Sequence, residues 1–569
     1  MTIAETERWR KCPSCGYLVP REAAVCQRCI PDVVPEAGSP APEDVPPAPP
    51  AAPTWPAPMP APPMPAAPTA VPYGNVMPEL LPSGNRGRTK GGSKQVPLFA
   101  GAGFVLAVLV AFAVGIFGSS SSHSYPSQWD PKLRDIAADV ARIRGLKFEH
   151  PVPVEFLSDA KFRRDVGVSG KTTAAVRRRA ARATEELRAL GLITGKVDLL
   201  KSMNADRQSR VLAYYSPERK VIVVRGTNAL NIATRVTLAH EMTHVLQDQH
   251  FDLEALRKRV AADRDSSTDA MRAIVKGDAN RVEARYVRGL SKSDRAAYQS
   301  SNEATVNTAK AESGSVPAVL SAGSEAPYRF GPPAIEVLLA DGGNGAVNAV
   351  MTRGVFNQKV FLDPTSVIHA TKATYVPPAK LAKGERAVGE SSSLGAYDGY
   401  QLLTSRLDPS TALSAATGWG GASNRTFQRK GDTCVRLAIR GANARASARL
   451  ADGFTAWAAT LPAGMAEVAT SGGLIIVTSC DLGATSPLTS PDAAIVHGSD
   501  VLDVNDGLIA EIVKDGAPLP TARCLVGELL AAPALRAVLA LTDESVNPDA
   551  IRDAIASAAP AARAGCGLG

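Results

Sequence analysis

The 569-residue chain carries 63 Lys and Arg against 55 Asp and Glu, a net charge of +8 that is mild for this length. At roughly 150 residues per domain, the length allows about three or four units. The sequence has no clustered basic stretch with interleaved aromatic residues, so no nucleic-acid binding is expected.

The first 30 residues are typical of a zinc ribbon in the cytoplasm. Two CxxC pairs are separated by a short spacer: Cys12, Cys15, Cys26 and Cys29. Four thiolates at this spacing can close a tetrahedral site and leave no position open, which predicts a structural zinc rather than a catalytic one. No motif in the sequence indicates what the ribbon binds. Residues 31–95 follow as a disordered linker rich in Pro and Ala, which cannot bury a core.

An uncharged apolar run extends from Val96 to Phe117. About 22 residues of helix span roughly 33 Å, enough to cross a bilayer core of roughly 30 Å, so residues 96–118 are predicted to be a transmembrane helix. Basic residues precede it: Arg86, Arg88, Lys90 and Lys94. This asymmetry predicts a single-pass cell-membrane protein with a cytoplasmic N-terminus and an extracytoplasmic C-terminal region.

Residues 125–420 are predicted to form a metallopeptidase domain of the α+β class. Helical periodicity covers 132–143, a short strand covers 153–157, and an Arg-rich helix covers 172–190. Two β-rich runs within 211–226 flank a Ser-Pro-Glu-Arg turn and predict a hairpin, which offers an edge strand to an extended peptide.

Directly after the hairpin, residues 237–250 read TLAHEMTHVLQDQH. His240 and His244 are four apart and share one face of a helix, where two imidazoles can bind one Zn²⁺. Glu241 then lies beside the metal-bound water and can act as the general base for attack on a peptide carbonyl. Leu238, Met242, Val245 and Leu246 give the opposite face an apolar character.

A catalytic zinc needs a third protein ligand. No HxxGxxH continuation follows His244, so a carboxylate from a later helix at 269–290 is expected. The candidates are Glu283, which shares the face of Lys276, and Asp278, which points the other way. We favour Glu283, whose alternative role is an ion pair with a neighbouring Arg.

The blocks PVPVEFL, VLAYYSPERKVIVVRG, TLAHEMTHVLQDQHFDLEAL and KGDANRVEARY resemble an actinobacterial family of zinc metallopeptidases, gluzincin-like zincins with two His and one Glu as ligands. The likeness continues through 327–350, DPTSV near 364 and GWGG at 418–421, and covers most of 125–480. It implies a zincin fold, zinc, peptide-bond hydrolysis, His240 and His244 as ligands and Glu241 as base. The family usually reads EGDA where this chain has Lys276-Gly277-Asp278-Ala279, which places an ammonium at an expected acidic position.

Residues 421–569 are predicted to form a small α+β accessory domain. Strands are expected around 426–441 and 472–481, with a helix between them. Four cysteines lie in this region: Cys434, Cys480, Cys524 and Cys566. They allow three disulfide pairings, among which we favour sequence neighbours.

Together these features predict a membrane-anchored zinc metalloendopeptidase that cleaves cell-envelope proteins or peptides and holds one catalytic and one structural Zn²⁺. The alternative is a weakened or inactive zincin-like ectodomain that serves as an interaction or sensing module, which Lys276 favours. A Ser or Cys hydrolase is set aside, because no nucleophile-elbow motif stands out.

Overall fold

The structure is a computed structural model that describes residues 9–11, 18–20, 125–167, 173–227, 229–313, 316–540 and 548–568. The chain divides into two units, Met1–Met64 and Pro65–Gly569. In the first unit, β1 (Trp9–Lys11) pairs antiparallel with β2 (Leu18–Pro20). The four ribbon cysteines, the linker at 31–95 and the predicted span at 96–118 lie outside the described residues.

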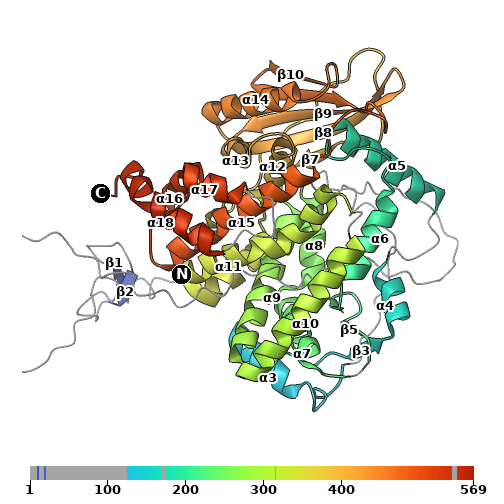
Figure 1. The fold of residues 1–569 in the computed structure, drawn as a ribbon. Helices are drawn as coiled ribbons and strands as arrows, with labels where there is room; N and C mark the ends of the chain where they lie inside the picture. Colours follow the sequence, from blue (N-terminus) through green and yellow to red (C-terminus); the bar gives the residue numbers. More distant parts are fainter. Residues whose placement is uncertain are drawn as a thin grey trace, which may run out of the picture. The chain divides into compact units, whose positions relative to one another are not determined.

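The first half of the second unit is mainly helical and contains one small sheet (Figure 1). Its helices are α3 (Arg134–Arg144), α4 (Asp159–Val166), α5 (Ala174–Ala189), α6 (Leu199–Arg210), α7 (Ile232–Phe251), α8 (Leu253–Ala262), α9 (Thr268–Gly289), α10 (Lys292–Ser313) and α11 (Ala318–Arg353). Its strands are β3 (Val154–Leu157), β4 (Ala213–Ser216) and β5 (Val221–Arg225). The sheet order is β3-β5-β4, with β3 parallel and β4 antiparallel to β5.

The predicted elements around the HExxH motif are confirmed. The hairpin is β4–β5, the motif lies on α7, and the later helix is α9. Helix α7 begins where the Asn231 side chain accepts a hydrogen bond from the backbone N–H of Thr234, and its apolar face packs against the sheet in one buried cluster with Tyr215 and Ile222. Burial of this face fixes the rotation of α7 and turns both motif histidines toward α9.

Helices α9 and α11 cross at two glycines. A Cβ on Gly277 would lie 2.4 Å from the carbonyl carbon of Gly331, and a Cβ on Gly331 would lie 2.2 Å from the backbone oxygen of Ala273. Only glycine allows the backbones to come this close. The crossing therefore fixes the position of Gly277 and of its neighbour Lys276.

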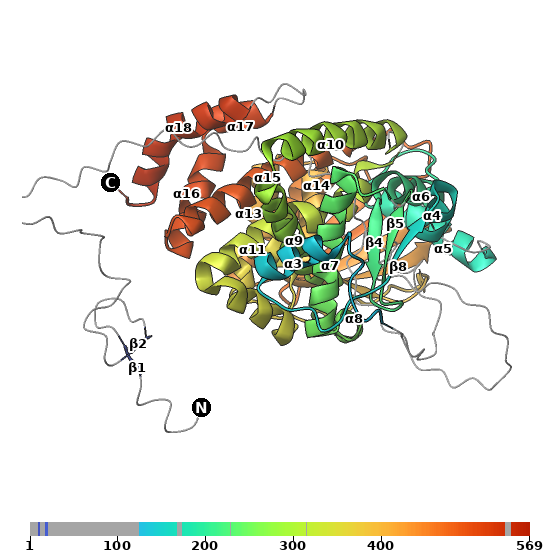
Figure 2. The same cartoon turned by 90° about the horizontal axis from the view of Figure 1, so that it is seen from below.

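The second half contains a larger sheet and a helical C-terminal part (Figures 1 and 2). Its strands are β6 (Arg386–Ala387), β7 (Ser392–Leu394), β8 (Trp419–Arg429), β9 (Asp432–Gly441), β10 (Ala466–Ser471) and β11 (Leu474–Cys480). Its helices are the 3₁₀ turns η1 (Gln358–Phe361) and η2 (Pro364–Val367), then α12 (Ala396–Thr404), α13 (Pro409–Ala416), α14 (Ala444–Ala459), α15 (Asp492–Lys514), α16 (Leu519–Ala531), α17 (Pro533–Leu539) and α18 (Pro548–Gly565). The sheet order is β10-β11-β9-β8-β6, and β7 also pairs with β8.

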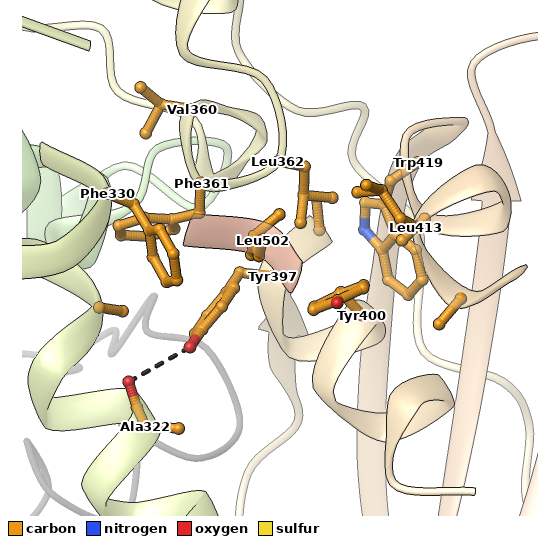
Figure 3. Close-up of a cluster of buried hydrophobic side chains, with 14 of the residues drawn as sticks. Ala322, Phe330, Val360, Phe361, Leu362, Tyr397, Tyr400, Leu413, Trp419 and Leu502 are labelled. Atoms are coloured by element: carbon orange, nitrogen blue, oxygen red, sulfur yellow. Dashed lines mark hydrogen bonds between the residues drawn. The ribbon is translucent and has the colours of Figure 1, made fainter. Parts of the chain in front are cut away.

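One hydrophobic core contains residues from both sides of residue 420, where the sequence predicts a domain boundary. Phe330 on α11 packs edge-on against Phe361, and Tyr397 on α12 lies against both rings while its hydroxyl donates to the Ala322 carbonyl at 3.2 Å (Figure 3). Trp419 on β8 belongs to the same buried cluster. The large sheet and the helices beside it are therefore joined by continuous apolar packing.

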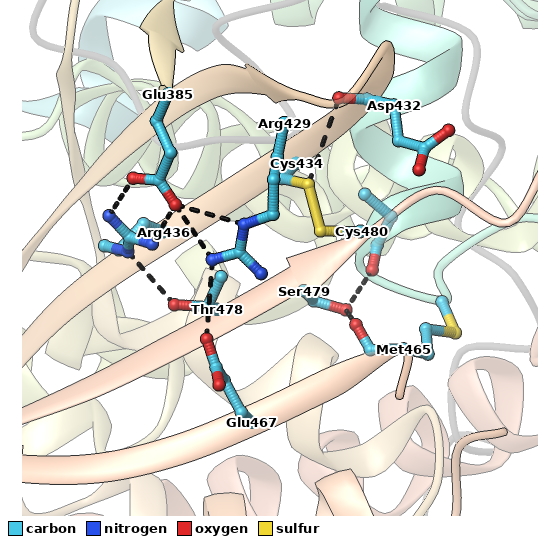
Figure 4. The surroundings of a disulfide bond; sticks show 11 residues. Glu385, Arg429, Asp432, Cys434, Arg436, Met465, Glu467, Thr478, Ser479 and Cys480 are labelled. Carbon is cyan, nitrogen blue, oxygen red and sulfur yellow. Dashed lines mark hydrogen bonds and ion pairs between the residues drawn. A yellow bond between two sulfur atoms is a disulfide. The ribbon is translucent and has the colours of Figure 1, made fainter. Parts of the chain in front are cut away.

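Two disulfides connect sequence neighbours, Cys434 with Cys480 and Cys524 with Cys566. The favoured pairing is thus confirmed. Cys434 and Cys480 lie opposite each other on β9 and β11 (Figure 4). Beside them, Arg436 donates two hydrogen bonds to the buried Glu385 carboxylate, at 2.7 and 2.9 Å, and this holds the pKa of Glu385 down to about 2.

The membrane prediction is corrected. Among the described residues, no helix is long and apolar enough to span a bilayer. The longest of them, α11, contains three prolines and charged residues such as Glu325 and Arg329. The described residues thus give no support to the predicted single-pass layout with a cytoplasmic N-terminus and an extracytoplasmic C-terminal region, whose span at 96–118 lies outside them. The α+β character of the fold is confirmed.

We expect Gly277→Ala to lower stability by about 2 kcal/mol or more, because the added Cβ has no room against α11. Gly289→Ala is the matched control in the same helix, since no atom lies within 4 Å of its added Cβ. Thermal unfolding of both variants measures the difference. Equal unfolding midpoints would contradict the close crossing.

We expect Glu385→Gln to destabilise the fold near pH 7 and to have little effect near pH 2. The folded-state pKa of about 2 lies below the ordinary value of 4.5, so the ionised carboxylate stabilises the fold above that ordinary value and loses this effect as the pH falls through about 2. Urea unfolding at both pH values tests this. Glu467→Gln is the control, because its side chain is 67% exposed and should respond weakly at either pH.

Candidate functional site

The two motif histidines meet on α7 as the sequence predicts. Their ring centroids lie 4.8 Å apart, and the residues are 1% and 0% exposed for His240 and His244. Each ring is held through Nδ1, which leaves Nε2 as the nitrogen with a lone pair. This arrangement is typical of imidazoles oriented to bind a cation.

His240 is held by Glu283. The Nδ1 atom of the imidazole lies 2.9 Å from Oε2 of Glu283, and the Tyr298 hydroxyl on α10 donates to Oε1 at 3.1 Å. The Glu283 carboxylate thus lies on the orienting nitrogen of His240. In this arrangement it positions the ring and supplies no ligand on the Nε2 side.

His244 is held by a side chain that the sequence analysis did not single out. Its Nδ1 donates to Oε1 of Gln247 at 2.8 Å, and Gln247 Nε2 donates to the Val275 carbonyl and to Asp278. Burial, followed by the neighbouring Lys276 and His240, lowers the pKa of His244 well below its ordinary value. The ring is therefore neutral. Gln247 lies three residues after His244, a helical spacing that would have indicated this contact.

Lys276 occupies the space beside the second histidine. Its Nζ lies 3.1 Å from Nε2 of His244 and 5.5 Å from the centre of the Tyr328 ring, and the residue is 2% exposed. The ammonium donates to the nitrogen lone pair and also lies over an aromatic face. A protein cation thus sits where the motif predicts a metal.

Glu241 faces the edge of the small sheet. Its Oε2 accepts a hydrogen bond from the backbone N–H of Tyr215 on β4 at 2.8 Å. Its other oxygen, Oε1, is buried and has no hydrogen-bond partner among the described residues, and the same holds for Nε2 of His240. The carboxylate is close to the histidines, but one oxygen is bound to the edge strand that was expected to receive a peptide.

The Asp278 carboxylate on α9 contacts both α3 and the Gln247 side chain of α7. It accepts from Arg144 on α3 at 2.6 Å and from Arg281 at 2.8 Å, and the Arg144 and Asp278 side chains are both fully buried. This carboxylate stabilises the packing of α3 against α9. It reaches His244 through Gln247, which hydrogen-bonds both residues.

The residues present do not fit a catalytic zinc. Such an ion takes three protein ligands, and here the Lys276 ammonium lies 3.1 Å from Nε2 of His244, the nitrogen that would bind the ion. Among the described residues, no group of three or more His, Cys, Asp or Glu could hold a metal ion. The predicted zincin-like metal centre is thereby corrected, and the physical reason is the charge of Lys276 together with the orientation of Glu283.

We expect Arg144→Ala to destabilise the protein by about 3 kcal/mol, because it leaves the buried Asp278 carboxylate with one fewer cationic partner. Arg142→Ala, in the same helix, is the control, since its pair with Asp139 is exposed and should contribute little. Chemical denaturation of both variants is the measurement. Similar midpoints would mean that the buried pair is not a structural link.

The chain matches no protein-family model, no curated protein and no solved structure.

Proposed function

We propose that the part of the chain that carries the HExxH motif is a peptidase-like domain that does not hydrolyse peptide bonds. It acts as a recognition module for a protein or peptide. The observation that carries the proposal is the 3.1 Å contact between Nζ of Lys276 and Nε2 of His244. An ammonium repels a divalent cation about 4 Å away by on the order of 8 kcal/mol at an effective dielectric constant of about 20. The charge of Lys276 therefore disfavours a metal at this position.

Burial supports the same proposal. Glu241 and His244 are 0% exposed, and the surrounding residues are almost as inaccessible. A general base must come within hydrogen-bond reach of the reacting group, and Glu241 instead contacts β4. Helix α10 packs along α6 and α7, and its Tyr298 hydroxyl donates to Glu283 (Figures 1 and 2). This helix therefore covers the histidine site on the side of Glu283.

A second candidate is a zinc-dependent peptidase acting on a protein or peptide, the activity that the sequence resemblance implies. Two buried atoms favour it, because Nε2 of His240 and Oε1 of Glu241 have no hydrogen-bond partner among the described residues. Buried polar atoms are usually paired, and an ion with its water would satisfy both. This candidate requires the Lys276 side chain to leave His244.

Zinc content separates the two candidates. We expect Lys276→Glu to bind about one more zinc per chain than the wild type, because the substitution removes the positive charge and supplies a carboxylate beside His244. Elemental analysis of full-length protein after dialysis against a weak chelator measures the difference. Comparison within the full chain cancels any zinc held by the N-terminal cysteines.

Two further variants make the result specific. Lys276→Met removes the charge without adding a ligand and should gain no tightly held zinc, while Lys276→Glu with His244→Ala should lose the gain. The wild type and Glu241→Gln should show the same background level of peptide cleavage. A zinc in the wild type that His244→Ala removes, with cleavage lost in Glu241→Gln, would replace our proposal by the second candidate.

A further inference from the structure

A separate cavity of about 460 Å³ lies where the start of α9, the segment before α12 and strand β8 meet. No residue of α7 lines it, so it is distinct from the histidine site. Its volume falls within the range of pockets that hold small organic ligands, about 300–1,000 Å³. Hydroxyl groups are abundant in its wall: Ser266, Ser267, Ser391, Ser392, Ser393 and Ser423.

One of these hydroxyls lacks a partner. Ser423 on β8 is 4% exposed, and its Oγ has no hydrogen-bond partner among the described residues. The adjacent Ser392 differs, because its hydroxyl donates to Asn424 at 2.6 Å. A buried hydroxyl that is left unpaired at a cavity wall offers both a donor and an acceptor to a ligand.

The charges of the wall balance. Arg264 and Arg425 are offset by Asp265 and Glu390. The first turn of α12 offers no ready anion site either, because Gln358 Oε1 accepts from the backbone N–H groups of residues 397 and 398. The cavity therefore suits a ligand without net charge.

Aromatic rings complete the wall. Tyr375 is 53% exposed, whereas Phe356 and Trp419 are each 2% exposed. The indole N–H of Trp419 already donates to the Leu394 carbonyl at 3.2 Å, so this residue can offer the cavity only its ring. Aromatic faces beside donor–acceptor hydroxyls match a molecule that has apolar C–H surfaces and many hydroxyl groups.

We propose that this cavity binds a neutral saccharide of one or two rings. The ligand packs on Tyr375 and forms hydrogen bonds with the Ser423 hydroxyl and its neighbours. This binding does not depend on the state of the histidine site. The same chemistry is offered by a free sugar and by the end of a neutral polysaccharide.

The test is a binding titration of the full chain with glucose, N-acetylglucosamine, maltose, cellobiose and diacetylchitobiose, followed by ligand-observed NMR and calorimetry. We expect saturable binding of at least one of them, weakened at least tenfold by Ser423→Ala and by Tyr375→Ala. Tyr125→Ala is the control, because this exposed tyrosine does not line the cavity and should leave the affinity unchanged. Tyr375 is also exposed enough for its variant to fold if the buried Ser423 variant does not.

Longer oligomers of the sugar that binds then identify its source. A hexamer that binds more tightly than the dimer indicates a polysaccharide end, and equal or weaker binding indicates a free sugar. The proposal is overturned if none of the five sugars binds, if binding survives both cavity variants, or if only glucuronic acid and sugar phosphates bind.

Discussion

The Lys276 ammonium donates to Nε2 of His244, and both groups are buried. This contact places a positive charge of the protein beside the nitrogen that would bind a metal in an HExxH site. The ammonium repels a cation at this position, whereas a carboxylate there would attract one. Whether the centre can hold a metal ion therefore depends on the sign of the charge beside His244.

The side chains around this contact hold both imidazoles in place. Glu283 orients His240, and Gln247 with Asp278 orients His244, so both rings keep Nε2 as the acceptor. The glycine crossing of α9 with α11 and the buried Arg144–Asp278 pair fix the position of α9, and with it Lys276. A rigid frame of this kind keeps the ammonium in place, because helices packed at backbone contact have little freedom to shift.

Helical and strand periodicity predicted much of this arrangement. The spacing of His240 and His244 and the hairpin before α7 both follow from local geometry. Periodicity predicts which face of a helix a side chain occupies, but not which atom of the neighbouring helix it contacts. Glu283 was therefore expected as a ligand on the Nε2 side of the histidines, whereas its carboxylate contacts Nδ1 of His240. The backbone contact of Tyr215 with Glu241 depends on tertiary packing that no local pattern encodes.

Features that join distant parts of the chain could not be predicted from the sequence. The cavity brings together residues near 265, 357, 391 and 423, which no motif connects. The membrane prediction rested on composition, and the metal-centre prediction rested on motif spacing and a family resemblance. Neither is supported by the described residues. The cysteine pairing was the exception, since Cys434 and Cys480 lie on strands that the sequence already indicated.

A crystal structure from zinc-containing solution, with anomalous diffraction recorded at the zinc edge, tests the contact between Lys276 and His244. We expect no anomalous peak between His240 and His244, and we expect Lys276 Nζ within hydrogen-bond distance of His244 Nε2. A peak bound by both Nε2 atoms, with the Lys276 side chain turned away, would contradict this expectation.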